Sequence, residues 1–277
     1  MSARPEQLSA PLELDSGGVQ AAYRRAGSGP PLVYFHGMGL TRRWLPLHEL
    51  FSRSFEVVVP EHPGFGDTPR PRWFRTLDDL VLHQADVLSA LGFDRFHLVG
   101  HSLGGRIAGS FAAIFPERVA SLTLIAPASL PLLTAPELLE PALPDPLPAD
   151  FDFDQLLFND NSSAYPDYLH GDDDGDLLAA VDDDPHADPG AWTLDGAASL
   201  YRRLQRVRTP AQVLVPDHDL VIDETCFAAW AQWLGGAELV RISGVSYPTG
   251  HLLIVQEPEQ IVAAVTRLVT RAREVER

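Results

Sequence analysis

Cysteine is almost absent from the chain, and this scarcity indicates the redox state of the compartment in which the protein works. The 277 residues include one cysteine, Cys226, so no disulfide can form within the chain. Such a composition is typical of reducing compartments, where disulfides are rare. We interpret Cys226 as a small side chain of the predicted helix around Phe227 and Trp230, and not as a catalytic thiol.

Long apolar runs are also missing. No window approaches about 18 consecutive apolar residues, so the sequence predicts no membrane span. The first 15 residues lack the basic and then apolar pattern of a secretory signal, and we expect none. Together with the single cysteine, these features predict a cytoplasmic protein without a membrane partner.

Positive charge is scarce. The chain has no lysine, and its 21 arginines stand against 38 acidic residues, which gives a net charge of −17. Binding to nucleic acid requires a basic face that neutralises phosphates, so we expect no nucleic-acid partner. No arginine occurs between Arg118 and Arg202, an interval that contains the Asp-rich stretches 172–176 and 182–184. We interpret these aspartates as a solvated acidic surface.

A calcium loop is the alternative interpretation of the first acidic stretch. Asp172, Asp174 and Gly175 have the spacing of part of an EF-hand loop, but the other ligands and the closing glutamate are missing. We therefore expect neither a metal site nor a cofactor.

Apolar runs without alternation recur along the chain and predict a parallel sheet that is covered on both faces. They lie at residues 32–35, 55–59, 96–99, 119–126 and 212–215, with a short one at 238–242 and a hairpin expected across 12–25. The helices predicted between them cover residues 76–91, 106–115, 224–234 and 258–271, the first with Thr76 as N-cap. This alternation predicts an α/β fold with a mostly parallel, doubly wound sheet of about eight strands flanked by helices.

The alternation stops between residues 128 and 208, where proline, leucine and aspartate dominate and no run has the character of a strand. Helix-like pieces occur near residues 154–158 and 192–206. We expect an inserted helical cap here. The predicted organisation is a core from 1–127, a cap from 128–208 and a second part of the core from 209–277.

The stretch at residues 98–105 carries the clearest chemical signal. Gly100, Ser102 and Gly104 form the G-x-S-x-G pattern of a nucleophile elbow, between a predicted strand and a predicted helix rich in small residues. Glycine allows the chain to turn back close to itself. The turn also places the serine hydroxyl at a helix N-terminus, where free N–H groups can receive an oxyanion. We predict that Ser102 is a nucleophile.

A serine hydroxyl needs an adjacent base, and the base needs an acid that orients it. His251 lies in a loop after the last predicted strand and is the expected base. Asp217 and Asp219 both follow the strand at 212–215. We favour Asp219, because its distance from the strand leaves room for the turn to swing the carboxylate toward His251, and Asp217 remains the alternative.

The chain resembles the α/β-hydrolase fold superfamily over residues 12–271, apart from the insertion. The order of serine, aspartate and histidine is that of this superfamily and differs from the orders in chymotrypsin and subtilisin. One position departs from the family pattern, since Pro216 stands where relatives usually have glycine. The motifs that carry the resemblance are the elbow, the turn His36-Gly37, residues 63–66, Asp219 and Gly250-His251.

The resemblance implies an oxyanion hole formed by the backbone N–H groups of Met38 and Leu103, and each such donor contributes about 3–4 kcal/mol to lowering the barrier. It also implies that the cap shapes the substrate pocket. Candidate substrate contacts are His36, Gly37, His101 and Arg106.

A serine nucleophile implies acyl transfer, and it excludes the dehalogenases and epoxide hydrolases of the superfamily, which attack with aspartate. We expect hydrolysis of a small-to-medium carboxylic ester or lactone. The substrate should be largely neutral, because the acidic cap repels strongly anionic molecules. Whether it is an ester or a lactone, the expected partner is a small-molecule substrate. The sequence leaves the oligomeric state open.

Two alternatives use the same scaffold. A carbon–carbon bond hydrolase of vinylogous diketones has the same triad and cap, and it would need a clamp for a carboxylate. Arg42, Arg43 and Arg106 are the candidates for such a clamp, although solvated or ion-paired arginines are the ordinary interpretation. A non-catalytic small-molecule receptor is the third hypothesis.

Overall fold

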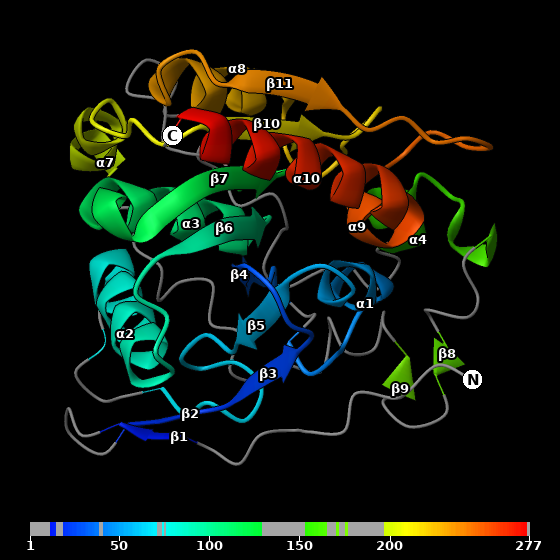
Figure 1. Ribbon diagram of the computed structural model, residues 1–277. Helices are drawn as coiled ribbons and strands as arrows, with labels where there is room; N and C mark the ends of the chain where they lie inside the picture. The colour runs from blue at the N-terminus through cyan, green and yellow to red at the C-terminus, as the bar shows by residue number, and fades with distance from the viewer. Residues whose placement is uncertain are drawn as a thin grey trace.

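The computed structural model describes residues 12–14, 19–38, 41–70, 74, 76–128, 153–164, 170–171, 175–176 and 197–275. Its main sheet has seven strands in the order β11-β10-β7-β6-β4-β5-β3 (Figure 1). The strands are β3 (Tyr23–Ala26), β4 (Pro31–Phe35), β5 (Glu56–Pro60), β6 (Phe96–His101), β7 (Val119–Ile125), β10 (Ala211–Val215) and β11 (Glu238–Arg241).

Neighbouring strands of the main sheet are parallel, apart from the antiparallel pair of β3 and β5. The mostly parallel sheet predicted from the apolar runs is thereby confirmed. β1 (Leu12–Leu14) and β2 (Val19–Ala21) pair antiparallel as the expected hairpin and form a sheet of their own, and the turn at 15–18 lies outside the described residues. The described main sheet therefore has seven strands where about eight were predicted.

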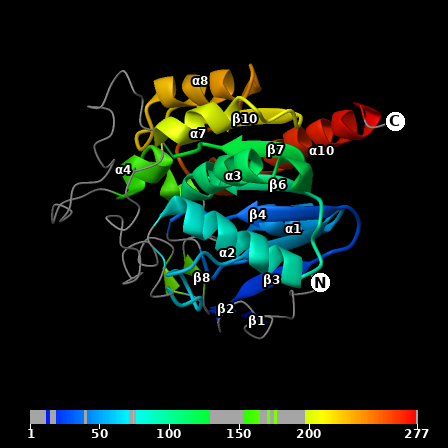
Figure 2. The ribbon, with the colours of Figure 1, turned by 90° about the vertical axis from the view of Figure 1, so that its left-hand side faces the viewer.

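Helices cover both faces of the sheet, as a doubly wound fold requires (Figures 1 and 2). α1 and α10 lie on one face, and α2, α3 and α8 lie on the other. The bounds are α1 (Pro46–Ser52), α2 (Leu77–Ala90), α3 (Leu103–Ile114), the 3₁₀ turn η1 (Pro116–Arg118), α8 (Glu224–Trp233), α9 (Leu253–Gln256) and α10 (Pro258–Val275).

Local signals in the sequence account for two of these helices. Thr76 is the N-cap of α2, as predicted, and its Oγ1 accepts the N–H of Asp79 at 3.2 Å. Cys226 is buried in α8 as one of its small core residues.

In the described part of the chain, no helix combines the length and the apolar character needed to cross a bilayer. The cytoplasmic location stays a prediction.

The predicted cap interval, residues 128–208, is described only in pieces. These are α4 (Phe153–Phe158), the 3₁₀ turn η3 (Ser162–Ala164), the short antiparallel pair β8 (His170–Gly171) and β9 (Gly175–Asp176), and α7 (Ala197–Leu204). α4 agrees with the helix predicted near 154–158, and α7 ends before residue 206. Residues 172–174 and 182–184 of the acidic stretches lie outside the described residues, as do 192–196. The cap as a unit stays a prediction.

The sheet topology brings distant segments of the chain to one edge. β4, β6 and β10 run in the same direction, so their carboxyl ends meet at the same edge of the sheet. The loop with His36 follows β4, Ser102 follows β6, and Asp219 follows β10.

α3 is anchored beneath this edge by a cluster of aromatic rings. Phe111 is fully buried, and its ring centroid lies 6.0 Å from that of Phe35 in β4 and 5.7 Å from that of Phe96 in β6. Edge-to-face and tilted ring pairs at these separations add to the free energy gained from burial. Phe111 therefore ties the helix that begins at Ser102 to the two strands that lead into the site.

Replacing Phe111 with alanine is expected to lower the free energy of unfolding by about 3–5 kcal/mol, because it leaves a cavity between α3 and the sheet. Phe111→Leu keeps most of the volume and should cost less than about 1.5 kcal/mol. Urea unfolding followed by tryptophan fluorescence measures both variants. Equal losses in the two variants would contradict a role that depends on filling this space.

Candidate active site

Ser102 lies on a strained turn between β6 and α3. Its backbone dihedrals are φ 52° and ψ −119°, in a region that residues other than glycine rarely adopt. The turn fits only because its neighbours lack side chains. A Cβ on Gly104 would lie 2.1 Å from the Phe35 carbonyl oxygen, and a Cβ on Gly100 would lie 2.2 Å from the Gly104 carbonyl oxygen.

His251 lies between Ser102 and Asp219. Its Nε2 is 2.9 Å from Ser102 Oγ, and its Nδ1 is 2.9 Å from Asp219 Oδ2. The carboxylate accepts the proton of Nδ1, which leaves Nε2 as the acceptor for the serine hydroxyl. The side chains of His251 and Asp219 are almost completely buried. Residues from three distant parts of the sequence are thus in direct contact.

The Asp219 carboxylate is held from both sides. Its Oδ1 accepts the backbone N–H groups of Val221 and Ile222 at 2.8 and 2.9 Å. Burial alone would raise the pKa of Asp219, but His251 and the two N–H groups outweigh it, so the pKa lies below its ordinary value. The carboxylate is therefore ionised at neutral pH and can stabilise positive charge on His251.

Asp217, the alternative acid, has a different set of partners. It accepts hydrogen bonds from Ser243 Oγ at 2.8 Å, from the N–H of Gly244 at 2.9 Å and from the N–H of Thr249 at 3.2 Å. These residues belong to the loop that leads to His251. Asp217 thus fastens that loop to the end of β10, and Asp219 is the carboxylate that contacts His251.

Gly37 brings the loop after β4 against Ser102. A Cβ at this position would lie 3.2 Å from Ser102 Cβ and 2.9 Å from His101 Nδ1, so only glycine fits without displacing them. Leu103 is the first residue of α3, where helical N–H groups have no partner within the helix. Met38 follows Gly37 and is partly exposed. Their role as oxyanion donors stays a prediction.

Similar proteins share this arrangement of sheet and helices. A family model described as alpha/beta hydrolase fold matches residues 30–164. A thermophilic esterase from Thermogutta terrifontis superposes with a TM-score of 0.72 at 21% identity, over 95% of this chain and 98% of that one. The chain has the α/β-hydrolase fold. The enol-lactonase from Burkholderia xenovorans superposes with a TM-score of 0.70 at 19% identity, over 94% of this chain and 100% of that one.

Sequence matches to known proteins cover less of the chain than the structural matches do. The 2-hydroxy-6-oxo-2,4-heptadienoate hydrolase of Pseudomonas putida is 36% identical over 115 residues, which are 40% of this chain and 42% of that protein. The chain spans about a third to two fifths of the length of the curated relatives it matches.

The departure at Pro216 is accommodated within the α/β-hydrolase fold. The Pro216 carbonyl oxygen accepts a hydrogen bond from Arg241 at 2.7 Å, which holds the end of β10 to the end of β11. Asp219 still reaches His251 three residues later.

His101 supports the position of His251 from within the elbow. Its ring nitrogen Nε2 donates to the His251 carbonyl oxygen at 3.0 Å, and the two ring centroids are 5.1 Å apart. Burial, together with the nearby His251, lowers the pKa of His101 to about 3, so the ring is neutral at neutral pH. Its side chain is buried, and the contact that it makes is with the histidine loop.

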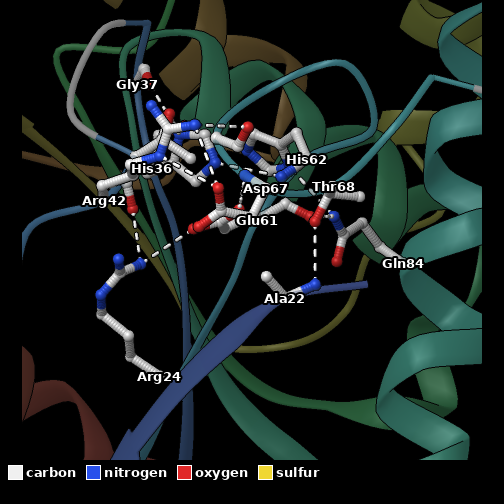
Figure 3. Close-up of polar contacts among 12 residues, drawn as sticks. Ala22, Arg24, His36, Gly37, Arg42, Glu61, His62, Asp67, Thr68 and Gln84 are labelled. Atoms are coloured by element: carbon white, nitrogen blue, oxygen red, sulfur yellow. Dashed lines mark hydrogen bonds and ion pairs between the residues drawn. The ribbon is translucent and has the colours of Figure 1, made fainter. Parts of the chain in front are cut away.

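His36 and His62 form a pair of buried rings behind the Gly37 turn (Figure 3). His36 Nδ1 donates to the Gly37 carbonyl oxygen at 2.7 Å, and His36 Nε2 accepts the N–H of His62 at 3.1 Å. His62 Nε2 donates back to the His36 carbonyl oxygen at 3.0 Å. Burial lowers the pKa of His36 to about 4 and that of His62 well below its ordinary value. Two neutral rings with defined tautomers therefore fix the backbone of this turn.

A second layer holds the two rings (Figure 3). Gln84, from α2, donates its Nε2–H to His62 Nδ1 and to the Glu61 carbonyl oxygen, both at 3.1 Å. Arg24, from β3, makes a buried ion pair of 3.0 Å with Glu61 and donates to the Thr41 carbonyl oxygen at 2.8 Å. These contacts connect the sheet and α2 to the Gly37 loop next to Ser102.

Sequence reasoning missed this second layer and the role of Asn159. Asn159 follows α4, and its Nδ2 donates to the His218 carbonyl oxygen at 3.1 Å and to the Thr249 carbonyl oxygen at 3.2 Å. One side chain thus joins the acid loop to the histidine loop. No local pattern marks Asn159, although its positive φ of 54° is a conformation that asparagine tolerates better than most residues.

The buried neutral histidines predict acid sensitivity. Burial lowers the pKa of His36 and His83 to about 4 and that of His48 and His101 to about 3, whereas an unfolded histidine has a pKa of about 6.5. As the pH falls from about 6.5 toward 4, the unfolded state binds protons that the folded state does not. The free energy of unfolding should therefore fall across this window and stay level above it.

His83→Leu tests this account, because neither ring nitrogen of His83 has a hydrogen-bond partner among the described residues. Removing one such group should reduce the slope of the unfolding free energy against pH by up to about 1.4 kcal/mol per pH unit. Urea unfolding at pH 7.5, 6 and 5 measures the slope. An unchanged slope in the variant would show that His83 is not neutral in the fold.

Proposed function

We propose that the chain is a serine hydrolase that cleaves a small-to-medium carboxylic ester or lactone through an acyl-enzyme. The observation that carries the proposal is the chain of contacts from Ser102 Oγ through His251 to Asp219, with 2.9 Å at each step. The names of similar proteins support this class of reaction, since they include an esterase and an enol-lactonase.

The proposed mechanism has two halves. Ser102 Oγ attacks the carbonyl carbon while His251 Nε2 takes the hydroxyl proton, and the Asp219 carboxylate stabilises the imidazolium. The N–H groups of Met38 and Leu103 stabilise the oxyanion. His251 then gives the proton to the leaving alcohol. In the second half His251 takes a proton from water, whose oxygen attacks the acyl-enzyme, and the proton returns to Ser102 as the acid leaves.

A carbon–carbon bond hydrolase is the second candidate. It is favoured by the similarity to a protein named 2-hydroxy-6-oxo-2,4-heptadienoate hydrolase, which is 36% identical over 115 residues. The same serine and histidine would serve both reactions, so turnover of a vinylogous diketone and not of esters would identify this candidate. Saturable binding of a small molecule without turnover would identify the third candidate, a receptor.

Wild-type protein is expected to hydrolyse p-nitrophenyl esters from the acetate to the dodecanoate series, with an optimum that reports the depth of the pocket. Ser102→Ala should lose at least about 10³-fold in kcat/KM, because the acyl-enzyme cannot form. Release of p-nitrophenol is the measurement, and circular dichroism checks that the variant is folded. Equal rates for the folded variant and the wild type would rule out Ser102 as nucleophile.

The two aspartates after β10 provide a matched pair. Asp219→Asn should reduce kcat/KM by about 10⁴-fold, since an amide can hold His251 in the wrong tautomer. Asp217→Asn should change kcat/KM by less than about tenfold and lower the free energy of unfolding by about 1–2 kcal/mol, because it weakens the hydrogen bonds to the histidine loop. Ester hydrolysis and urea unfolding of both variants distinguish the roles, and the reverse ranking would make Asp217 the acid.

A further inference from the structure

Arg106 lies one helical turn beyond the nucleophile. Its N–H donates to the Ser102 carbonyl oxygen at 3.2 Å, which places it about 6 Å further along the axis of α3. Gly104 faces β4, and Arg106 lies on the opposite side of the helix. Long side chains on a helix extend back over the preceding turn. By this rule the side chain of Arg106 is expected to extend toward the N-terminal end of α3, where Ser102 lies.

The chain enters the predicted cap at the same turn. A Cβ on Gly105 would lie 2.9 Å from Pro127 Cβ, and the N–H of Ala128 donates to the Ser102 carbonyl oxygen at 2.9 Å. Arg106 thus lies on α3 close to both the elbow and the start of the predicted cap.

Arg106 is half-buried and has no counter-ion among the described residues. Its Nε is fully buried and has no hydrogen-bond partner there. Several other arginines form ion pairs, such as Arg24 with Glu61 and Arg203 with Asp78, each at 3.0 Å. Burial lowers the pKa of Arg106 to about 10, so the group is still charged at neutral pH.

An unpaired charge in a half-buried position is unfavourable, and the protein retains one a single helical turn from Ser102. A carboxylate is the matching ligand, because its two oxygens fit the fork of N–H donors in a guanidinium group. One negative charge is balanced by one guanidinium, whereas a more highly charged ligand would meet the repulsion of a chain with net charge −17. The expectation of a largely neutral substrate is based on the acidic cap and does not take this local positive charge into account.

We propose that Arg106 binds a carboxylate group of the substrate, so that the preferred substrate is an ester or lactone that also carries one free carboxylate. This proposal rests on the proposed function, because it assumes that the bond cleaved lies at Ser102. Arg106 is a binding residue in this account and takes no part in the proton transfers.

Pairs of esters that differ by one carboxylate test the proposal. The mono-p-nitrophenyl esters of succinate, glutarate and adipate are compared with the p-nitrophenyl esters of butanoate, pentanoate and hexanoate. In at least one pair, wild-type kcat/KM should favour the carboxylate ester. Arg106→Met should lower kcat/KM for that ester about 10- to 100-fold and change the value for its neutral partner by less than about threefold. For the carboxylate ester, kcat/KM of Arg106→Lys should lie between the values of the wild type and Arg106→Met.

Arg203→Gln is the matched control, because it removes an arginine of α7 that is exposed and already paired with Asp78. In Arg203→Gln, the ratio of kcat/KM for the carboxylate ester to kcat/KM for the neutral ester should equal that of the wild type. The proposal is overturned if no wild-type pair favours the carboxylate ester, or if Arg106→Met lowers both esters of a pair equally.

Calorimetry with Ser102→Ala separates this proposal from the proposed function. The variant should bind the preferred carboxylate ester, and adding Arg106→Met should abolish the binding. If the wild type cleaves no ester but this pattern of binding holds, the esterase assignment fails and the carboxylate site stands. If the wild type cleaves esters and Arg106→Met leaves the binding unchanged, the carboxylate site fails and the esterase assignment stands.

Discussion

Close contact of backbone with backbone at the elbow is the constraint on which the rest of the site depends. No side chain separates α3 from the end of β4, because a Cβ on Gly104 would lie 2.1 Å from the Phe35 carbonyl oxygen. The strained φ of Ser102 persists because the buried strands and α3 hold both ends of the turn. Ser102, the loop at Gly37 and the N-terminus of α3 therefore have fixed positions relative to one another.

Neutral polar groups extend this rigidity away from the elbow. His36, His62 and Gln84 form hydrogen bonds in which each donor has a defined acceptor, and burial keeps both rings uncharged. Such bonds are strong in a medium of low dielectric constant. Charge is retained at Asp219, where backbone N–H groups stabilise it, and at Arg106, where no described group does. Most of the buried polar groups that support the site are thus neutral, and charge is retained at a few positions such as Asp219 and Arg106.

Features with a local cause were predicted from the sequence, and features that depend on distant contacts were not. The elbow glycines follow from short-range sterics, and the N-cap at Thr76 follows from local hydrogen bonds. The parallel strands follow from apolar patterning. Ser102, Asp219 and His251 were selected by their order and their place after strands, and they lie in contact in the structure. The role of Asn159 and the isolation of Arg106 arise only when segments far apart in sequence meet. The end of α7 and the number of strands in the main sheet also differ from the prediction, because both depend on packing between distant segments.

The contacts of α4 have a consequence for protein engineering. Besides Asn159, the carbonyl oxygen of Leu157 in α4 accepts the N–H of Leu252 at 3.1 Å, next to His251. This short stretch of the cap interval is therefore part of the scaffold that holds the histidine. A chimera that exchanges the whole interval 128–208 for that of another protein with the α/β-hydrolase fold would remove both contacts. A graft that keeps residues 153–159 and exchanges the remainder would preserve both contacts and still replace most of the predicted cap.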